Sequence, residues 1–242
     1  MIENLKKIIS ASQNIVFFGG AGVSTESNIP DFRSEDGIYR TVNKYGYSPE
    51  VILSRTFFIS HTEEFFDFYR NNMIFSTAQP NKAHLALAEL EKKGSLQAVI
   101  TQNIDGLHQA AGSDSVVELH GSVHRNYCIN CGEQYNLDYV INYREVVPKC
   151  SKCGNTVRPD VTLYEESLSP YVLNKAVSRI KAADVLVVGG TSLAVYPAAG
   201  LIDYYKGSKL ILINKSTTPY DQRANLIIHD SIGKVLDEVV MC

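Results

Sequence analysis

The sequence predicts an α/β protein with a doubly wound parallel sheet and a second, smaller module. Short apolar runs of strand length alternate with stretches of helical periodicity along most of the chain. A glycine-rich turn follows the first of these runs, as it does where parallel sheets bind phosphate groups. Two closely spaced cysteine pairs interrupt the alternation in the middle of the chain, which indicates the smaller module.

The strands and helices of the sheet are expected in a regular order. The predicted strands cover residues 14–18, 96–101, 116–119, 184–189, 209–213 and 226–228. An amphipathic helix opens the chain, a second begins after its cap Asn81, and others are predicted over residues 169–182, 197–206 and 232–240. Because strands and helices alternate, the sheet is predicted to be parallel, with helices on both faces.

Residues 36–76 break this rhythm and are predicted to form an inserted helical lobe. They are rich in tyrosine and phenylalanine, and helices are expected over residues 48–54 and 61–75. A helical connection with an ordinary core face explains the same pattern, and both interpretations can hold together.

Composition excludes several classes of function. The formal net charge is −3 and the pI is about 6.1, which gives no basic surface for DNA or RNA. The N-terminus lacks the apolar region of a secretory signal, and no apolar run approaches the roughly 20 residues that span a bilayer. We therefore expect a cytoplasmic, monomeric protein that binds neither nucleic acid nor membranes.

The glycine-rich turn at residues 20–25 (GAGVST) carries the first two glycines of a dinucleotide fingerprint. Glycines there let the backbone approach a pyrophosphate, which the amides of a helix N-terminus then bind. The third position holds Thr25 in place of Gly or Ala, so a strand-to-helix turn without a ligand explains the turn equally well. Residues 30–33 (PDFR) follow, and they offer a carboxylate, a ring and a guanidinium suited to phosphate.

Polar residues and a histidine follow two further strands. Residues 101–108 (TQNIDGLH) place Gln, Asn and Asp just past a buried strand, where doubly wound folds bind their ligands. A capped turn is the structural alternative. His120 comes directly after the next strand, at a position suited to a general base whose pKa lies near neutral pH.

The cysteine spacing predicts a structural zinc site. Cys128 and Cys131 are followed after eighteen residues by Cys150 and Cys153, which matches the four-cysteine zinc ribbon. Four thiolates leave no open coordination position, so the metal is expected to be structural and not catalytic.

Together these motifs resemble the sirtuins, the NAD-dependent protein-lysine deacylases, in their bacterial form. The resemblance runs from about residue 10 to about residue 240 and also includes residues 190–193 (GTSL) and 213–214 (IN). It implies a Rossmann-type NAD-binding domain formed by residues 1–35, 77–121 and 158–242. The helical insertion at 36–76 and the zinc ribbon at 122–157 would form the small domain.

The resemblance also implies roles for individual residues. His120 would be the general base and Asn103 a second catalytic residue. Val161 would pair with the backbone of an acetylated peptide. The residues implied to bind NAD are Ala21, Gly22, Thr25, Phe32, Arg33, Gln102, Ile104, Asp105, Thr191, Ser192, Asn214 and Ile232. The implied products are nicotinamide, free lysine and O-acetyl-ADP-ribose.

Three positions depart from the family pattern. Gly19 stands where many members carry Thr, Asn28 where many carry Gly, and Glu165 where the family usually has Gly. A glutamate does not adopt the dihedral angles of glycine cheaply, so the peptide-side loop is expected to differ. An added carboxylate there would favour basic peptides, and simple surface exposure of Glu165 is the alternative.

The helical lobe predicts the preferred acyl group. Members that remove acidic acyl groups carry Tyr-x-x-Arg, whereas here Tyr69 is followed at that spacing by Asn72. Arg70 lies one position on and should point elsewhere on a helix. We therefore expect a preference for acetyl or other uncharged groups.

Three competing functions use the same motifs. An ADP-ribosyltransferase or NAD hydrolase would need the same NAD-binding residues, and an intact His120 favours deacylation. A zinc-ribbon module that binds nucleic acid or protein is the second alternative, and the acidic pI argues against nucleic acid. A sensor that binds NAD without turnover would be expected to lack the histidine.

Overall fold

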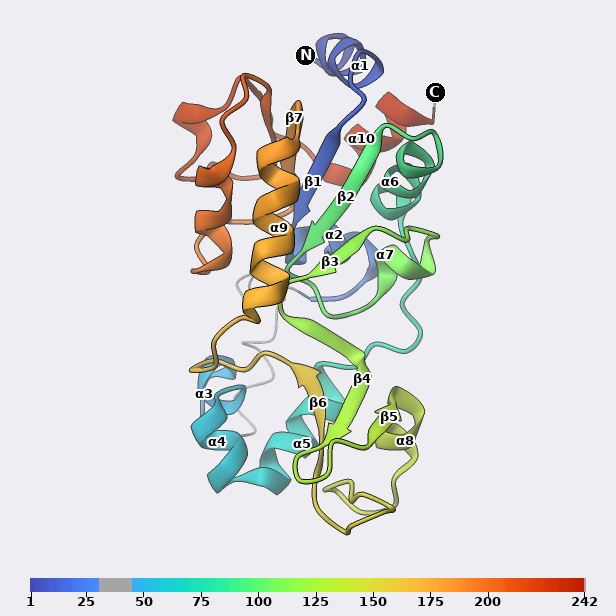
Figure 1. The fold of residues 1–242 in the computed structure, drawn as a ribbon, viewed down its shortest axis with the longest axis vertical. Coiled ribbons are helices and arrows are strands. Elements are labelled where there is room, and N and C mark those ends of the chain that lie inside the picture. Colours follow the sequence, from blue (N-terminus) through green and yellow to red (C-terminus); the bar gives the residue numbers. More distant parts are fainter. Residues whose placement is uncertain (31–44, 242) are drawn as a thin grey trace.

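The computed structural model of this chain describes residues 1–30 and 45–241. Two sheets organise these residues, one of six strands and one of three. Figure 1 shows the larger sheet and its helices in the upper half of the molecule and the smaller sheet in the lower half. Phe32 and Arg33 lie outside the described residues, so their expected roles have no structural counterpart.

The larger sheet is parallel in every pairing and has the order β3-β2-β1-β7-β8-β9. Its strands are β1 (Ile15–Gly19), β2 (Leu96–Thr101), β3 (Val116–Glu118), β7 (Val185–Gly189), β8 (Leu210–Ile213) and β9 (Leu226–Ile228). The chain moves outward from β1 through β2 to β3, returns to β7 on the other side of β1, and moves outward again. This reversal confirms the predicted doubly wound order and places a switch point between β1 and β7.

Helices cover both faces of this sheet because its strands alternate buried side chains between two cores. One face packs against α1 (Ile2–Ser10), α6 (Lys82–Lys92) and α10 (Ile232–Val240). The other face packs against α9 (Pro170–Ala182) and the 3₁₀ helix η3 (Ala198–Tyr204). Within β1, Phe17 belongs to the first core and Phe18 to the second.

Short helices follow the strands at the edge where the sheet carries its polar residues. They are α2 (Ala21–Ser24) and η1 (Thr25–Ser27) after β1, and α7 (Leu107–Ala110) after β2. The 3₁₀ helix η4 (Asp221–Arg223) precedes β9. The predicted helix over residues 197–206 is a 3₁₀ helix in the structure, which corrects its expected type.

The smaller sheet has the order β5-β4-β6 and is antiparallel. Its strands are β4 (Gly121–Cys128), β5 (Gln134–Asn136) and β6 (Val157–Val161), with α8 (Leu137–Asn142) beside them. Strand β4 begins at the polar edge of the large sheet and runs into the lower half of the molecule (Figure 1).

The helical insertion packs on this small sheet and shares one hydrophobic core with it. The core joins aromatic residues such as Phe65 and Phe66 to Val123 and Val157. The insertion forms α3 (Pro49–Ile52), α4 (Arg55–Ser60) and α5 (Thr62–Asn72). The predicted single helix over 48–54 ends early because the Ser54 hydroxyl accepts a hydrogen bond from the Phe57 amide and begins α4 instead.

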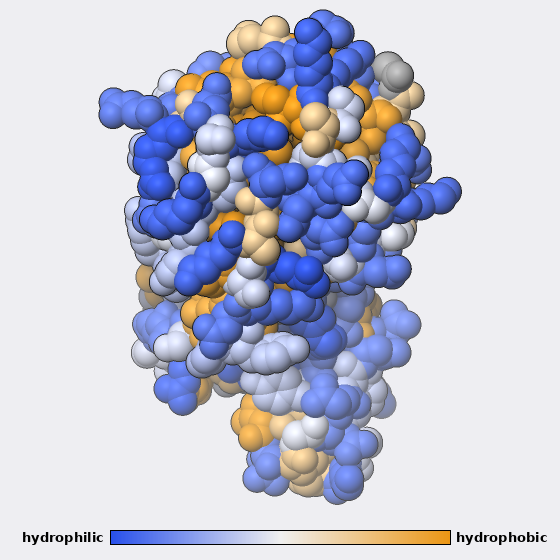
Figure 2. All heavy atoms as spheres, turned by 45° about the horizontal axis from the view of Figure 1, so that its top comes forward, coloured by the Kyte–Doolittle hydropathy of each residue, from blue (hydrophilic) through white to orange (hydrophobic). Residues whose placement is uncertain are grey.

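The surface of the molecule agrees with its composition. Figure 2 shows a face covered mostly by hydrophilic side chains, with hydrophobic side chains exposed in small groups between them. No helix in the described part of the chain is long and apolar enough to cross a bilayer.

Candidate active site

The site lies at the carboxyl ends of β1, β2, β7 and β8, around the switch point of the sheet. Two tight turns meet there, and their backbones approach closely because they carry glycine. The Gly22 amide donates a 2.7 Å hydrogen bond to the Gly190 carbonyl. A Cβ atom on Gly22 would lie 2.8 Å from that carbonyl oxygen, and one on Gly190 would lie 2.5 Å from the Val23 nitrogen. The two turns therefore require glycine at both positions.

A hydrogen-bonded group of side chains joins the glycine-rich turn to residues 101–108. The Asn103 amide donates to the Gly20 carbonyl at 3.0 Å and to the Ser24 hydroxyl at 2.9 Å. The Ser24 hydroxyl in turn donates to the Asp105 carboxylate at 2.6 Å. The sequence analysis assigned no role to Ser24, yet its hydroxyl connects Asn103 and Asp105, which were both predicted to belong to the site. Its place in the GAGVS motif was the one available signal.

Asp105 is largely buried, and burial raises the pKa of its carboxyl group above its usual value. Hydrogen bonds from Ser24 and from the Leu107 amide, the latter at 2.9 Å, act in the opposite direction. On the far side, the His124 ring lies 2.9 Å from the Asp105 carbonyl. The neighbouring Ile104 carbonyl accepts the Val123 amide at 3.0 Å, so this turn is attached to β4.

Residues expected to bind the adenosine half lie on the other side of the switch point. The Gln102 amide group donates to the Thr191 hydroxyl at 3.0 Å, and the Thr191 backbone amide donates to the Asn214 side-chain oxygen at 2.9 Å. The side-chain nitrogen of Asn214 is buried and has no hydrogen-bond partner among the described residues. Ile232 is buried where α10 begins, and Ser192 is exposed in the same loop as Thr191.

Ala21 and Thr25 complete the glycine-rich turn. Ala21 begins α2 directly after Gly20, and the Thr25 hydroxyl donates to the Gly22 carbonyl at 3.0 Å. This bond explains why a threonine is compatible with the turn at the position where the fingerprint has Gly or Ala. Asn28 adopts a left-handed conformation with φ of 62°, which asparagine tolerates better than most residues.

His120 lies between the end of β3 and the start of β4. Its Nδ1 is 2.9 Å from the Gln102 carbonyl oxygen. A carbonyl oxygen only accepts, so Nδ1 carries the hydrogen and Nε2 of the neutral ring keeps its lone pair. Burial lowers the pKa of His120 below its usual value, against the smaller opposing effect of the Gln102 carbonyl. The ring is therefore neutral at pH 7 and is able to accept a proton.

Val161 lies at the end of β6, opposite Gly121 on β4. Gly121 has φ of 80°, and a Cβ atom there would lie 1.9 Å from the Asp160 carbonyl oxygen. This close approach brings the end of β6 beside the residue that follows His120.

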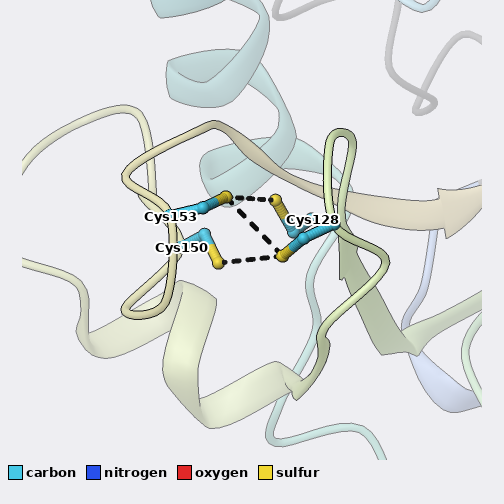
Figure 3. A group of neighbouring side chains, drawn as sticks. Cys128, Cys150 and Cys153 are labelled. Carbon is cyan, nitrogen blue, oxygen red and sulfur yellow. Dashed lines mark hydrogen bonds between the residues drawn. The ribbon is translucent and has the colours of Figure 1, made fainter.

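The four cysteines form one cluster at the tip of the small module. Their sulfur atoms all lie within 4.8 Å of one another. The Sγ–Sγ distances are 3.5 Å for Cys128–Cys153 and 3.6 Å for both Cys131–Cys150 and Cys131–Cys153, too long for disulfides of about 2.0 Å. Figure 3 shows the sulfur atoms of Cys128, Cys150 and Cys153 turned toward a common point. Four thiols in this arrangement fit a tetrahedral zinc ion.

Each cysteine pair lies in a tight turn, or knuckle, and the two knuckles, at residues 128–132 and 150–154, have the same backbone hydrogen bond. The amides of Gly132 and Gly154 donate to the carbonyls of Cys128 and Cys150 at 3.0 and 2.9 Å. Both glycines have positive φ, 71° and 74°. A glycine there closes the turn without strain, so each pair presents two sulfurs on one side.

Fold and site together define a Rossmann-type dinucleotide-binding protein with a zinc-ribbon module. The Sir2 family model matches residues 20–197. Curated relatives include the NAD-dependent protein deacetylases of Clostridium acetobutylicum and Clostridium tetani. They are 63% identical over 239 and 238 residues, which cover 99% and 98% of this chain and 98% and 96% of the relatives.

Solved structures agree with this assignment. A complex of Sir2 with a p53 peptide and NAD⁺ has a TM-score of 0.88 at 38% identity and covers 100% of this chain and 98% of its own. A complex with a deacetylated p53 peptide and 3′-O-acetyl ADP ribose has a TM-score of 0.89 at 38% identity and covers 99% and 97%. The chain belongs to the Sir2 family.

Proposed function

We propose that this chain is an NAD-dependent protein-lysine deacetylase that yields nicotinamide, free lysine and O-acetyl-ADP-ribose. The geometry of His120 carries the proposal. Its ring is held by the Gln102 carbonyl with Nε2 available as a base, at the same sheet edge where Asn103, Asp105 and Asn214 gather. The relatives named as NAD-dependent protein deacetylases support the same activity.

The residues of the site fit NAD. The close backbone contact between the Gly22 and Gly190 turns leaves no side chain where a pyrophosphate would approach. The unpartnered side-chain nitrogen of Asn214 is a donor suited to a ribose hydroxyl. We propose that Ala21, Gly22 and Thr25 bind the phosphates and that Thr191, Ser192, Asn214 and Ile232 bind the adenosine half. Phe32 and Arg33 are proposed to complete the site from the segment outside the described residues.

NAD supplies an electrophilic ribose carbon once its nicotinamide departs. We propose that Gln102 and Asn103 orient the nicotinamide ribose and that Ile104 and Asp105 bind the carboxamide. His120 Nε2 would accept a proton from a ribose hydroxyl, so that the hydroxyl oxygen becomes a better nucleophile. Val161 would pair with the backbone of the acetylated peptide and place its lysine toward His120.

The four cysteines would hold zinc as a structural ion. All four positions of a tetrahedral site would be filled by protein ligands. Cys128 ends strand β4, whose other end, at Gly121, follows His120. Zinc therefore takes no part in the proposed chemistry.

The division of the chain into domains stays a proposal. We propose that residues 1–35, 77–121 and 158–242 form the NAD-binding domain and that residues 36–76 and 122–157 form the small domain. The separate cores on the two sheets support two domains, while strand β6 (Val157–Val161) of the small sheet extends across the proposed boundary. A cytoplasmic location, a monomeric state and the lack of nucleic-acid binding also remain predictions. Size-exclusion chromatography with light scattering tests the monomer directly.

Product analysis tests the function. The purified protein is incubated with NAD and an acetyl-lysine peptide, and nicotinamide, deacetylated peptide and O-acetyl-ADP-ribose are measured together. Deacetylation predicts equal amounts of all three. Nicotinamide with free ADP-ribose and an unchanged peptide would identify an NAD hydrolase, and ADP-ribose attached to protein would identify a transferase. Either result would overturn the proposal.

A further inference from the structure

Glu165 has an unusual backbone conformation for a residue with a side chain. Its φ is +72°, in the left-handed region that favours glycine. It lies in the loop of residues 161–166, at the position where the family usually has Gly. Strained conformations of this kind persist when the surrounding contacts hold the residue in place. We therefore expect contacts of the Glu165 side chain to stabilise this left-handed conformation.

The Glu165 side chain is bound to helix α4 of the small module. Its Oε2 atom accepts a 2.9 Å hydrogen bond from the Thr56 amide and a 2.7 Å bond from the Thr56 hydroxyl. These two bonds lower the pKa of Glu165, so the side chain is ionised at neutral pH. The carboxylate thus joins two segments that are 109 residues apart in sequence.

Backbone bonds beside Glu165 join the same two segments. The Arg55 amide donates to the Tyr164 carbonyl and the Tyr164 amide donates to the Leu53 carbonyl, both at 3.0 Å. On the other side of the loop, Arg158 forms a two-point ion pair with Glu166, at 2.7 and 3.0 Å. Glu166 therefore attaches the loop to strand β6, which contains Arg158. Residues 164 and 165 attach it to the segment at the start of α4.

The other end of this loop, at Val161 and Thr162, lies beside His120. The Thr162 amide donates to the His120 carbonyl at 2.9 Å, and Val161 pairs with Gly121. Glu165 also lines an open groove of about 410 Å³, together with Tyr47, Phe57 and other residues of the helical insertion. A shift of the loop away from α4 would change both the groove and the strand end beside His120.

We propose that Glu165 is a positioning residue that latches the loop of residues 161–166 onto helix α4 and so maintains the binding site for the peptide substrate. The inference rests on the proposed function, because it concerns the affinity of the same site for its peptide. Glu165 is exposed, as the alternative expectation from the sequence stated, and its Oε2 atom is bound to Thr56.

Kinetics of four variants test the latch. Glu165→Ala and Glu165→Gly both remove the carboxylate, and the glycine variant also relieves the left-handed strain. Both should raise KM for an acetyl-lysine peptide by roughly tenfold, with kcat and KM for NAD nearly unchanged. Glu165→Gln keeps an oxygen acceptor and should restore most of the affinity. Glu64→Ala removes an exposed carboxylate from α5 of the same module and should change nothing.

A double-mutant cycle identifies the partner. Thr56→Ala removes the hydroxyl but keeps the backbone amide, so its effect on the peptide KM should be smaller than that of Glu165→Ala. Combined with Glu165→Ala it should add almost nothing, because residues in direct contact are not additive. Additive effects, or a glycine variant with the peptide KM of the wild type, would overturn the proposal.

Hydrogen exchange gives a readout that does not depend on activity. Without substrates, the amides of Arg55, Thr56 and Tyr164 should exchange faster in Glu165→Ala and Glu165→Gly than in the wild type. Unchanged exchange would overturn the latch even if the enzyme is active. A wild-type protein with no deacetylase activity would contradict the proposed function instead, and the exchange comparison would still decide whether the latch exists.

Discussion

At the scale of single residues, the chemistry depends on how the backbone fixes two side chains. The Gln102 carbonyl determines which nitrogen of His120 carries the hydrogen, and the Ser24 hydroxyl joins Asn103 to Asp105. Each partner reaches the site from a different strand end. The sequence motifs predicted His120, Asn103 and Asp105 as candidate site residues. Their hydrogen-bond partners could be identified only in the folded structure, where the strand ends lie together.

His120 should determine the acid limb of the pH profile. Burial lowers its pKa below 6.5, and only the neutral ring accepts a proton. The deacetylation kcat/KM should therefore be constant near neutral pH and fall on acidification, with a midpoint below 6.5. An apparent pKa well above 7 would contradict this assignment. His120→Ala should reduce turnover by at least about 10²-fold at every pH.

The helical insertion should favour acetyl over succinyl groups. Tyr69 is buried in the aromatic core and stacks on Phe65, while the Arg70 guanidinium donates to the Glu145 carbonyl at 3.0 Å. The Arg70 guanidinium is thus bound elsewhere, and Asn72 carries no charge that could pair with an acidic acyl group. Initial rates on matched acetyl- and succinyl-lysine peptides test this. Faster removal of succinyl at equal concentration would refute it.

At the scale of elements, each insertion depends on the other. The aromatic side chains of α4 and α5 pack on β4 and β6. Strand β4 ends at Cys128, and β6 follows Cys153 in the chain. Their shared core was not foreseen, because residues 36–76 and 122–157 are far apart in sequence and each pattern was interpreted by itself. The cysteine spacing, by contrast, predicted the four-thiol cluster fully, because zinc geometry restricts the spacing itself.

Removal of zinc should disorder the small module and leave the large sheet folded. Each knuckle is closed by backbone hydrogen bonds such as those from the Gly132 and Gly154 amides, and like-charged thiolates without a metal would repel one another. Cys150→Ser, or a strong chelator, should lower peptide turnover and accelerate amide exchange in β4, β5 and α8. Exchange in β1, β2 and β7 is the internal control and should stay slow. Equal loss of protection in both sheets would contradict this.

A pair of buried histidines between α6 and α7 should make stability depend on pH. The rings of His84 and His108 are 0% and 1% exposed and lie 4.7 Å apart. In the described part of the chain, neither ring nitrogen of His108 has a hydrogen-bond partner. Burial lowers the pKa of His84 to about 4 and that of His108 to about 3.

Both rings are neutral in the folded protein but gain protons below about pH 6.5 when it unfolds. Stability should therefore be full above that pH and decline as the pH falls toward the folded-state values. Thermal unfolding at pH 7.5 and 5.0 measures the decline. His108→Phe keeps an aromatic ring in the core and should show a smaller difference between the two pH values. An unchanged difference would contradict the role of this pair.

At the scale of the whole molecule, the alternation of strands and helices was sufficient to predict the doubly wound sheet. All six predicted strands are present, and their observed ends differ from the predicted ends by at most one residue. The motifs also predicted the family, and the comparisons confirm it. Two features could not be predicted. Glu165 adopts a left-handed conformation because Thr56, 109 residues away, binds its carboxylate. Ser54 begins α4 as its N-cap and also forms a bridge to Tyr164, which is far away in sequence.

We propose that the switch point of the sheet binds NAD beside the neutral imidazole of His120. A calorimetric titration of NAD into the zinc-loaded His120→Ala variant, with acetyl-lysine peptide present, tests it without turnover. The account predicts saturable binding of one NAD per chain, with a Kd of about 1 mM or tighter. No detectable binding of NAD at millimolar concentration, with or without the peptide, would contradict it.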